Sequence, residues 1–315
     1  MRYPGFTSIS ERIYIDKYIK KKLNNDINNI NKEQINILDF GPCMGASTIA
    51  MANSIKNKNV KIYAFDAFQF KKNTDFKDYF FEIIQNYDES LLKYVDENET
   101  NIFFKRLFEK LTKKYSSIYL RECTIKSSKK DIPDIPKGRI LLAHIDLPKT
   151  MNVGIHIMDY ICDNLQKNQS DLTLVFQDYA YHWSSEIIIY VGILINNGAK
   201  VKKIVGPSLY LNLKNPSSII KNSNLDYENY CITQSKEFII RMIDISLDKT
   251  ESFVDQIRKN ELLLACSIYC ISQNLDIDIK EKFYKKIIKN KITINSLTDS
   301  LLDIQKNQNK MQLSI

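Results

Sequence analysis

The sequence predicts an α/β fold built on a mostly parallel sheet. Two apolar stretches, INILDF at 35–40 and VKIYAFDAF at 60–68, flank a glycine turn and an alanine-rich helical pattern. Two strands joined by one helix over about 30 residues form a βαβ unit, whose strands run parallel. Strand and helix patterns keep alternating further along the chain, which indicates that the same sheet continues.

The other elements follow in chain order around this unit. Ahead of it, apolar spacing over 8–23 predicts an amphipathic helix, and Glu11 three residues after Ser8 matches a capping box. After it, helical patterns cover 154–165 and 184–197, and the chain from about 232 onward is mainly helical. Further strands are expected at 117–123, 139–147, 172–180, 200–206 and 208–213. Seven strands flanked by helices therefore make up the expected sheet.

Three regions are expected along the chain. Residues 1–30 form an N-terminal lead-in helix, 31–215 form the main domain, and 216–315 form a helical C-terminal extension. Within the main domain, about 69–114 is helical in pattern and rich in Phe, Tyr and acids, which predicts an insertion over the carboxyl edge of the sheet. The amphipathic extension would suit either a cap on the sheet or a contact between subunits of a homo-oligomer.

The composition is that of an ordinary globular protein. Hydrophobic residues make up 44% and charged residues 26% of the 315 residues, and the net charge of +8 is spread without a block of five like charges. We therefore favour a solvated surface over nucleic-acid binding. No stretch nears the roughly 18 apolar residues of a membrane span, and the N-terminus lacks the apolar core of a signal peptide. The six cysteines are scattered, apart from Cys266 and Cys270, so we expect reduced thiols and a cytoplasmic protein.

The turn after the first strand has the features of a nucleoside site. Gly41 and Gly45 let the backbone approach a ligand, but residue 43 is Cys, so the dinucleotide fingerprint is absent. No Gly-Lys-Ser/Thr follows, which excludes a phosphate loop. Asp66 ends the next strand, where a carboxylate can accept both hydroxyls of a ribose. This combination suits a nucleoside without a pyrophosphate, such as S-adenosylmethionine.

The remaining cofactor contacts are expected around the same turn. Asp39, at the end of the first strand, would face the positively charged methionine portion. The alternative is a plain connection in which this acid caps the helix and Asp66 is itself a cap. The predicted cofactor-binding residues are Asp39, Gly41, Gly45, Ser47, Thr48, Asp66 and Phe68.

Four stretches carry a family resemblance: ILDFGPCMGAST, IYAFDAF, LLAHIDL and LVFQDY. In this order they resemble class I S-adenosylmethionine-dependent methyltransferases, in particular the macrocin O-methyltransferase (TylF)-like family. The resemblance covers about residues 7–183. It implies a Rossmann-like class I methyltransferase fold and methylation of a sugar or other small molecule.

The metal and catalytic motifs depart from the family pattern. The resemblance implies a divalent cation held by acids of the fourth and fifth strands, and Asp146 and Asp178 stand at matching positions. Pro148 and Gln177 replace the other two acids, so we expect at most a weak Mg²⁺ site made of Asp146, Asp178 and Gln177.

The resemblance implies a general base at the position of Pro148. A proline cannot take a proton, so another residue must act as the base. His182, in the loop YAYHWSS, is the better placed histidine, and His144 is the second histidine candidate. Asp146 completes the predicted catalytic residues. The competing interpretations are a core role for His144 and a packed loop without chemistry at His182 and Trp183.

We therefore expect an O-methyltransferase that transfers the methyl group of S-adenosylmethionine to a hydroxyl of a sugar or other small polar acceptor. A nucleic-acid methyltransferase is not favoured, because HIDLPKT is not the Asn/Asp-Pro-Pro-Tyr type of stretch that receives a flipped base. The alternative is a catalytically degenerate protein that keeps the fold and acts as a binding or scaffold subunit, as the replacements at 148 and 177 suggest.

Overall fold

The computed structural model describes residues 4–25, 33–74, 76–126, 128–146, 150–181 and 185–272, and every structural statement refers to these. The chain divides into two compact units. Unit 1 comprises Met1–Leu147, His156–Val175 and Lys214–Ser217, and unit 2 comprises Pro148–Ile155, Phe176–Leu213 and Ser218–Ile315.

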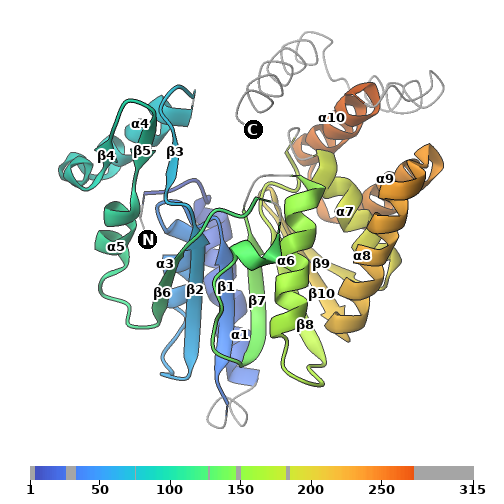
Figure 1. Cartoon of the computed structure of the whole chain (residues 1–315), viewed down its shortest axis with the longest axis horizontal. Coiled ribbons are helices and arrows are strands. Elements are labelled where there is room, and N and C mark those ends of the chain that lie inside the picture. The colour runs from blue at the N-terminus through green and yellow to red at the C-terminus, as the bar shows by residue number, and fades with distance from the viewer. Residues whose placement is uncertain are drawn as a thin grey trace. The chain divides into compact units, whose positions relative to one another are not determined.

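The main sheet has seven strands in the order β6-β2-β1-β7-β8-β10-β9 (Figure 1). β1 pairs in parallel with β2 and β7, β2 pairs in parallel with β6, and β9 and β10 are antiparallel. The strands are β1 Ile35–Phe40, β2 Val60–Asp66, β6 Ile118–Glu122, β7 Arg139–Ile145, β8 Asp171–Phe176, β9 Lys200–Val205 and β10 Ser208–Lys214. This mostly parallel sheet flanked by helices matches the Rossmann-like methyltransferase fold, so the predicted fold class is confirmed.

The first strand, β1, is buried along its whole length. All six residues of β1 are buried, as its short apolar run predicts for a strand of a parallel sheet. Its polar residues are hydrogen-bonded, since Asn36 Nδ2 donates to the carbonyl oxygen of Pro136 at 2.9 Å. α3, Ala46–Ala52, follows the glycine turn and is also wholly buried.

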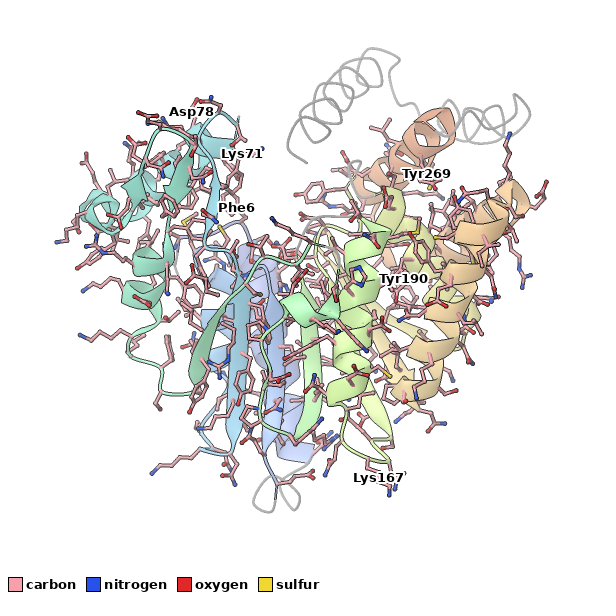
Figure 2. All side chains as sticks on the ribbon, in the orientation of Figure 1. Phe6, Lys71, Asp78, Lys167, Tyr190 and Tyr269 are labelled. Atoms are coloured by element: carbon pink, nitrogen blue, oxygen red, sulfur yellow. The ribbon has the colours of Figure 1, made fainter. Side chains whose placement is uncertain are left out.

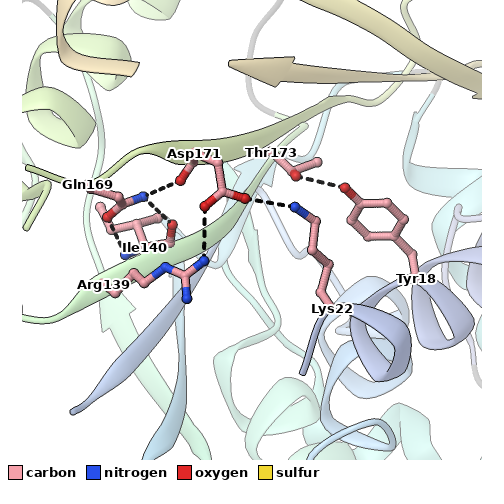
Figure 3. A network of polar contacts seen from close by, with 7 residues as sticks. All are labelled: Tyr18, Lys22, Arg139, Ile140, Gln169, Asp171 and Thr173. Carbon is pink, nitrogen blue, oxygen red and sulfur yellow. Dashed lines mark hydrogen bonds and ion pairs between the residues drawn. The ribbon is translucent and has the colours of Figure 1, made fainter. Parts of the chain in front are cut away.

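The lead-in helix α1, Ile9–Asn25, packs against α3 and is tied to β8 by polar contacts (Figure 3). Lys22 Nζ lies 2.9 Å from Asp171 Oδ2, and Arg139 Nη2 lies 2.9 Å from Asp171 Oδ1. The Tyr18 hydroxyl lies 2.8 Å from the Thr173 hydroxyl. Burial alone would raise the pKa of Asp171, but its two cationic partners hold it below its usual value. These contacts fix α1 to β8 within unit 1, and Arg139 links the same carboxylate to β7.

The insertion contains strands that the sequence did not predict. It consists of β3 Gln69–Lys71, α4 Phe76–Asp88, a 3-10 turn at Glu89–Tyr94, β4 Asp96–Glu97, β5 Asn101–Phe103 and α5 Lys105–Thr112. The strands form a separate sheet in the order β3-β5-β4, with antiparallel pairing. Strands of two or three residues are too short to show an alternating pattern, so the sequence predicted the helices of the insertion but not its strands.

The helices of unit 2 surround α7, Ser185–Asn196, whose residues Ile187–Leu194 are all buried. α9, Lys236–Thr250, and α10, Gln256–Ser272, both pack on α7, and α8, Pro216–Thr233, precedes them. Gly192 permits this packing, because a Cβ there would lie 2.1 Å from the backbone oxygen of Met242 in α9. Helices α9 and α10 of the extension therefore cover α7. α6, Met151–Asn164, begins in unit 2 and continues into unit 1. None of the described helices has the length and apolarity of a membrane span.

Candidate cofactor site

The turn between β1 and α3 is built from left-handed backbone conformations. Gly41 has φ 84°, Cys43 has φ 49° and Gly45 has φ 91°. The Gly45 N–H donates to the carbonyl oxygen of Pro42 at 2.8 Å, which closes the turn before α3 begins. Glycine adopts positive φ at little cost, whereas Cys43 adopts it with some strain.

Asp66 holds this turn against the end of β2. Its Oδ2 accepts the backbone N–H of Cys43 at 3.0 Å, and its Oδ1 accepts the N–H of Phe68 at 2.8 Å. The Gly41 N–H also donates to the carbonyl oxygen of Phe65 at 2.8 Å. The expectation that the glycine turn and Asp66 lie together is therefore confirmed.

The Asp66 carboxylate is poorly solvated in the free protein. Burial raises its pKa to about 6, although the backbone N–H donors of Phe68 and Cys43 act in the opposite direction. The negative charge of Asp39 contributes to the rise. A carboxylate has about four lone-pair sites, so Asp66 can accept hydrogen bonds beyond the two it already receives. Ligand hydroxyls at this position would stabilise its charged form.

Asp39 lies in the interior beneath the turn, and its side chain is fully buried. Its Oδ1 lies 2.9 Å from His144 Nδ1, and its Oδ2 accepts the hydroxyls of Ser47 at 3.1 Å and Thr48 at 2.5 Å. Both carboxylate oxygens are therefore engaged by the protein itself. This placement favours the interpretation in which Asp39 fixes the start of α3, and it does not fit a direct contact with a ligand.

His144 is also a core residue, with a side chain that is 2% exposed. Burial alone would lower its pKa, but the hydrogen bond and charge of Asp39 raise it above the usual value, and Asp146 and Glu11 add to the rise. The imidazole therefore pairs with Asp39 across β1 and β7. The structure fits the core interpretation of His144, with a carboxylate rather than the backbone as its partner.

Two of the predicted cofactor contacts need correction. The Phe68 side chain is 1% exposed, and its ring packs against Phe104 and Phe108 of the insertion, with ring centroids 5.9 and 5.0 Å away. Only its backbone N–H, bonded to Asp66, takes part in the site. A Cβ on Gly45 would lie 3.0 Å from Cε2 of Phe108, so the missing side chain makes room for the insertion, and only the backbone of Gly45 can face a ligand.

Cys43 and Cys123 border Asp66, and the sequence did not single them out for this role. The Cys123 N–H donates to the carbonyl oxygen of Asp66 at 2.9 Å. Burial and nearby carboxylates raise the pKa of Cys43 well above its ordinary value and that of Cys123 to about 12. Both side chains are therefore neutral thiols near neutral pH. The position of Cys43 in the glycine turn could have indicated that it lies near Asp66. Cys123 follows a strand and belongs to no motif, so nothing in the sequence indicated its position.

The predicted acids of the fourth and fifth strands lie in different units. Asp146 follows β7 in unit 1, where its N–H donates to the carbonyl oxygen of Phe40 at 2.7 Å. Gln177 and Asp178 follow β8 in unit 2. Gln177 is 3% exposed, and its Oε1 has no hydrogen-bond partner in the described part of the chain. Asp178 has φ 60°.

Three further residues of the sequence predictions, Pro148, His182 and Trp183, lie outside the described residues. Among the residues that the structure describes, no group of three or more His, Cys, Asp or Glu side chains could hold a metal ion. The weak Mg²⁺ site and the base role of His182 therefore stay predictions.

Solved methyltransferase structures are similar to this chain at low identity. Precorrin-6y C5,15-methyltransferase from Geobacter metallireducens is 13% identical, with a TM-score of 0.32, over 63% of this chain and 87% of that protein. An O-methyltransferase family protein from Burkholderia thailandensis is 7% identical, with a TM-score of 0.32, over 65% and 59%. Coclaurine N-methyltransferase, bound to N-methylheliamine and SAH, is 13% identical, with a TM-score of 0.29, over 87% and 69%.

No family model and no curated protein matches the chain. At these TM-scores the similar structures carry no argument about activity, and the fold assignment rests on the strand order and on the parallel pairing around β1.

Proposed function

We propose that this protein is an S-adenosylmethionine-dependent O-methyltransferase that acts on a hydroxyl of a sugar or other small polar acceptor. One observation carries the proposal: the Asp66 carboxylate at the end of β2 is bonded to the glycine turn at the end of β1. In open α/β sheets, ligands bind outside the carboxyl ends of the strands. A partly buried carboxylate beside a glycine turn is suited to a ribose and a short polar chain.

Each group near the turn then has a defined task. Asp66 accepts the ribose hydroxyls, and the backbone of 41–45 faces the amino-acid portion of the cofactor. Asp39, His144 and the hydroxyls of α3 keep that backbone in place. The bound cofactor supplies a methyl group on a positively charged sulfur. Asp146 follows the strand next to β1, so it is the described acid best placed to bind the acceptor.

The acceptor class and the base are the finer parts of the proposal. The resemblance to the macrocin O-methyltransferase (TylF)-like family supports a sugar acceptor, and His182 is the proposed base. Gln177 offers an amide oxygen where the family resemblance leads us to expect a carboxylate, so a Mg²⁺ ion bound at the end of β8 would be held weakly.

A second candidate function is a binding or scaffold subunit that keeps the fold without catalysis. Pro148 and Gln177 favour it, because each removes an acid that the family resemblance leads us to expect. Cofactor binding with no methyl transfer to any acceptor would support this candidate.

Calorimetric titration with S-adenosylhomocysteine tests the proposal. We expect the Asp66→Ala variant to bind about 100-fold more weakly or worse, because two charge-assisted hydrogen bonds are lost. The Glu122→Ala variant is the matched control, since Glu122 lies opposite Asp66 on β6 but is exposed and paired with Lys105. Equal affinity of wild type and the Asp66 variant would refute the assignment. A repeat with Mg²⁺ and a screen with labelled S-adenosylmethionine would then address the metal and the acceptor.

A further inference from the structure

The segment just before α1, Pro4–Ser8, lies close to the candidate cofactor turn within unit 1; we call it the N-terminal clasp. Gly5 has φ 146°, and a Cβ built on it would lie 2.5 Å from the Cβ of Ala46. Ala46 is the first residue of α3 and follows Gly45 directly. Only glycine permits so close an approach, so the clasp is fitted against the end of the turn.

Side chains of α1 hold the clasp in this position. Arg12 is 7% exposed, and its guanidinium donates from Nε to the carbonyl oxygen of Thr7 at 2.7 Å and from Nη2 to that of Gly5 at 3.2 Å. Burial lowers the pKa of Arg12, and the neighbouring charge of Glu11 raises it in part. The Glu11 carboxylate accepts the Ser8 N–H at 2.9 Å, which fixes where α1 begins. These side-chain bonds hold a segment that is neither helix nor strand.

The clasp also reaches the insertion through Phe6, which lies where the insertion meets the rest of unit 1 (Figure 2). The Phe6 ring centroid is 4.8 Å from that of Phe76 and 5.2 Å from that of Tyr79, both on α4. Phe6 and Cys43 pack against the same buried hydrophobic cluster, which includes Phe80 and Phe104 of the insertion. Since the Cys43 N–H is bonded to Asp66, the clasp and the proposed ribose-binding acid are linked through one residue of the turn and the cluster it packs against.

The contacts of Phe6 with α4 can break at low cost. Phe76 is 37% exposed and Tyr79 is 54% exposed, so water already reaches both partner rings. Segments that rest on partly exposed contacts and a few hydrogen bonds open more readily than core elements. The clasp is thus closed by Arg12 on one side and by a weak aromatic contact on the other.

We propose that Pro4–Ser8 is a gate of the cofactor site, latched by Arg12, which opens to admit and release the cofactor. This inference rests on the proposed function. Arg12 is a positioning residue, because it acts on the carbonyls of the clasp and not on the ligand. A gate lowers both the entry and the exit rate when it is shut, whereas a segment that only packs against the ligand affects its exit alone.

Stopped-flow measurement of S-adenosylhomocysteine binding distinguishes these cases. Arg12→Met removes both donors and keeps an apolar chain, and Phe6→Ala removes the contact with α4. We expect each variant to raise the association and dissociation rates by about tenfold, because each loosens the closed state by one or two contacts. Arg106→Met is the matched control, since Arg106 is exposed and paired with Asp96 on the insertion.

The outcomes separate the gate from the proposed function. If wild type binds and the association rates of both variants equal that of wild type, the gate is overturned while the cofactor site stands. If wild type does not bind at all, the proposed function and the gate fall together. Hydrogen exchange at residues 5–8 gives a second measurement, in which the ligand should protect these amides in wild type and Arg12→Met should speed their exchange without ligand. If Arg12→Met fails to fold, the Phe6→Ala variant alone tests the gate by the same rate measurements.

Discussion

If Asp66 holds the ribose as proposed, its raised pKa makes cofactor binding depend on pH in a defined direction. Its rise from 3.8 to about 6 means that the charged form costs about 3 kcal/mol more in the folded than in the unfolded chain. Ribose hydroxyls would donate hydrogen bonds to the charged form and so lower the pKa of Asp66 in the complex. Binding therefore favours the carboxylate over the carboxylic acid.

The size of the effect follows from the free-state pKa. Above about pH 7 the carboxylate is charged before the ligand arrives, so the dissociation constant of S-adenosylhomocysteine should be flat. As the pH falls below 6, a growing fraction of the protein is protonated, and at pH 5 binding should be about tenfold weaker than at pH 7. The loss continues until the pH reaches the pKa of Asp66 in the complex.

Calorimetry at pH 5, 6, 7 and 8 in buffers of equal ionic strength measures this dependence. Asp66→Asn keeps one acceptor oxygen and does not titrate, so its binding should be weaker than that of wild type and free of this slope. His144 and Asp39 remain in the variant, and the difference between the two proteins isolates Asp66. A flat wild-type profile between pH 5 and 7, or the same slope in both proteins, would refute the role of Asp66 in binding.

Three stability predictions follow from single contacts, all measured by urea unfolding. His144→Phe should cost about 3–5 kcal/mol, because the buried carboxylate of Asp39 loses its imidazole partner, and a loss under 1 kcal/mol would contradict this pairing. Gly192→Ala should cost at least about 1–3 kcal/mol, since its Cβ would meet a backbone oxygen of α9, whereas Gly154→Ala, with a nearest neighbour at 4.0 Å, should be tolerated. Asp171→Asn should cost about 1–3 kcal/mol at pH 7, and the difference from wild type should vanish as the pH falls below about 4, because the lowered pKa of this carboxyl group stabilises the fold only while it is charged.

The sequence was sufficient where a pattern extends over a whole element. The buried run of β1 and the apolar spacing of α1 are long enough to show their periods, and both elements lie within one or two residues of the predicted ranges. The approach of Asp66 to the glycine turn was also predictable, because parallel neighbouring strands end at the same edge of a sheet. The fold and the proximity of Asp66 to the turn therefore followed from the order and length of the elements.

The strand and helix patterns did not predict the direction in which individual side chains point. Asp39 and Asp66 both stand at the ends of buried strands, yet Asp39 points into a network of hydroxyls and imidazole while Asp66 faces the turn. The residues around Asp39 in the sequence do not indicate its pairing with His144, which comes from a strand far along the chain. Likewise, the ring of Phe68 was assigned to a ligand although it belongs to the core of the insertion.

Cys43 illustrates the same limit and yields a last prediction. Its presence at the second glycine position of the dinucleotide fingerprint excluded that fingerprint, yet its backbone adopts the left-handed conformation that glycine favours. Cys43→Gly should therefore keep the turn and bind S-adenosylhomocysteine within about threefold of wild type, since relief of strain offsets the loss of a half-buried side chain.

Cys43→Val should act in the opposite direction. A β-branched residue at φ 49° is strained, so the turn should shift and the Cys43 N–H should leave Asp66. We expect weaker binding by about tenfold and a lower unfolding free energy by about 1–3 kcal/mol. Wild-type affinity in the valine variant would mean that the bond between the turn and Asp66 does not organise the ligand site. In that case the backbone conformation at position 43 would have no part in the function proposed for this site.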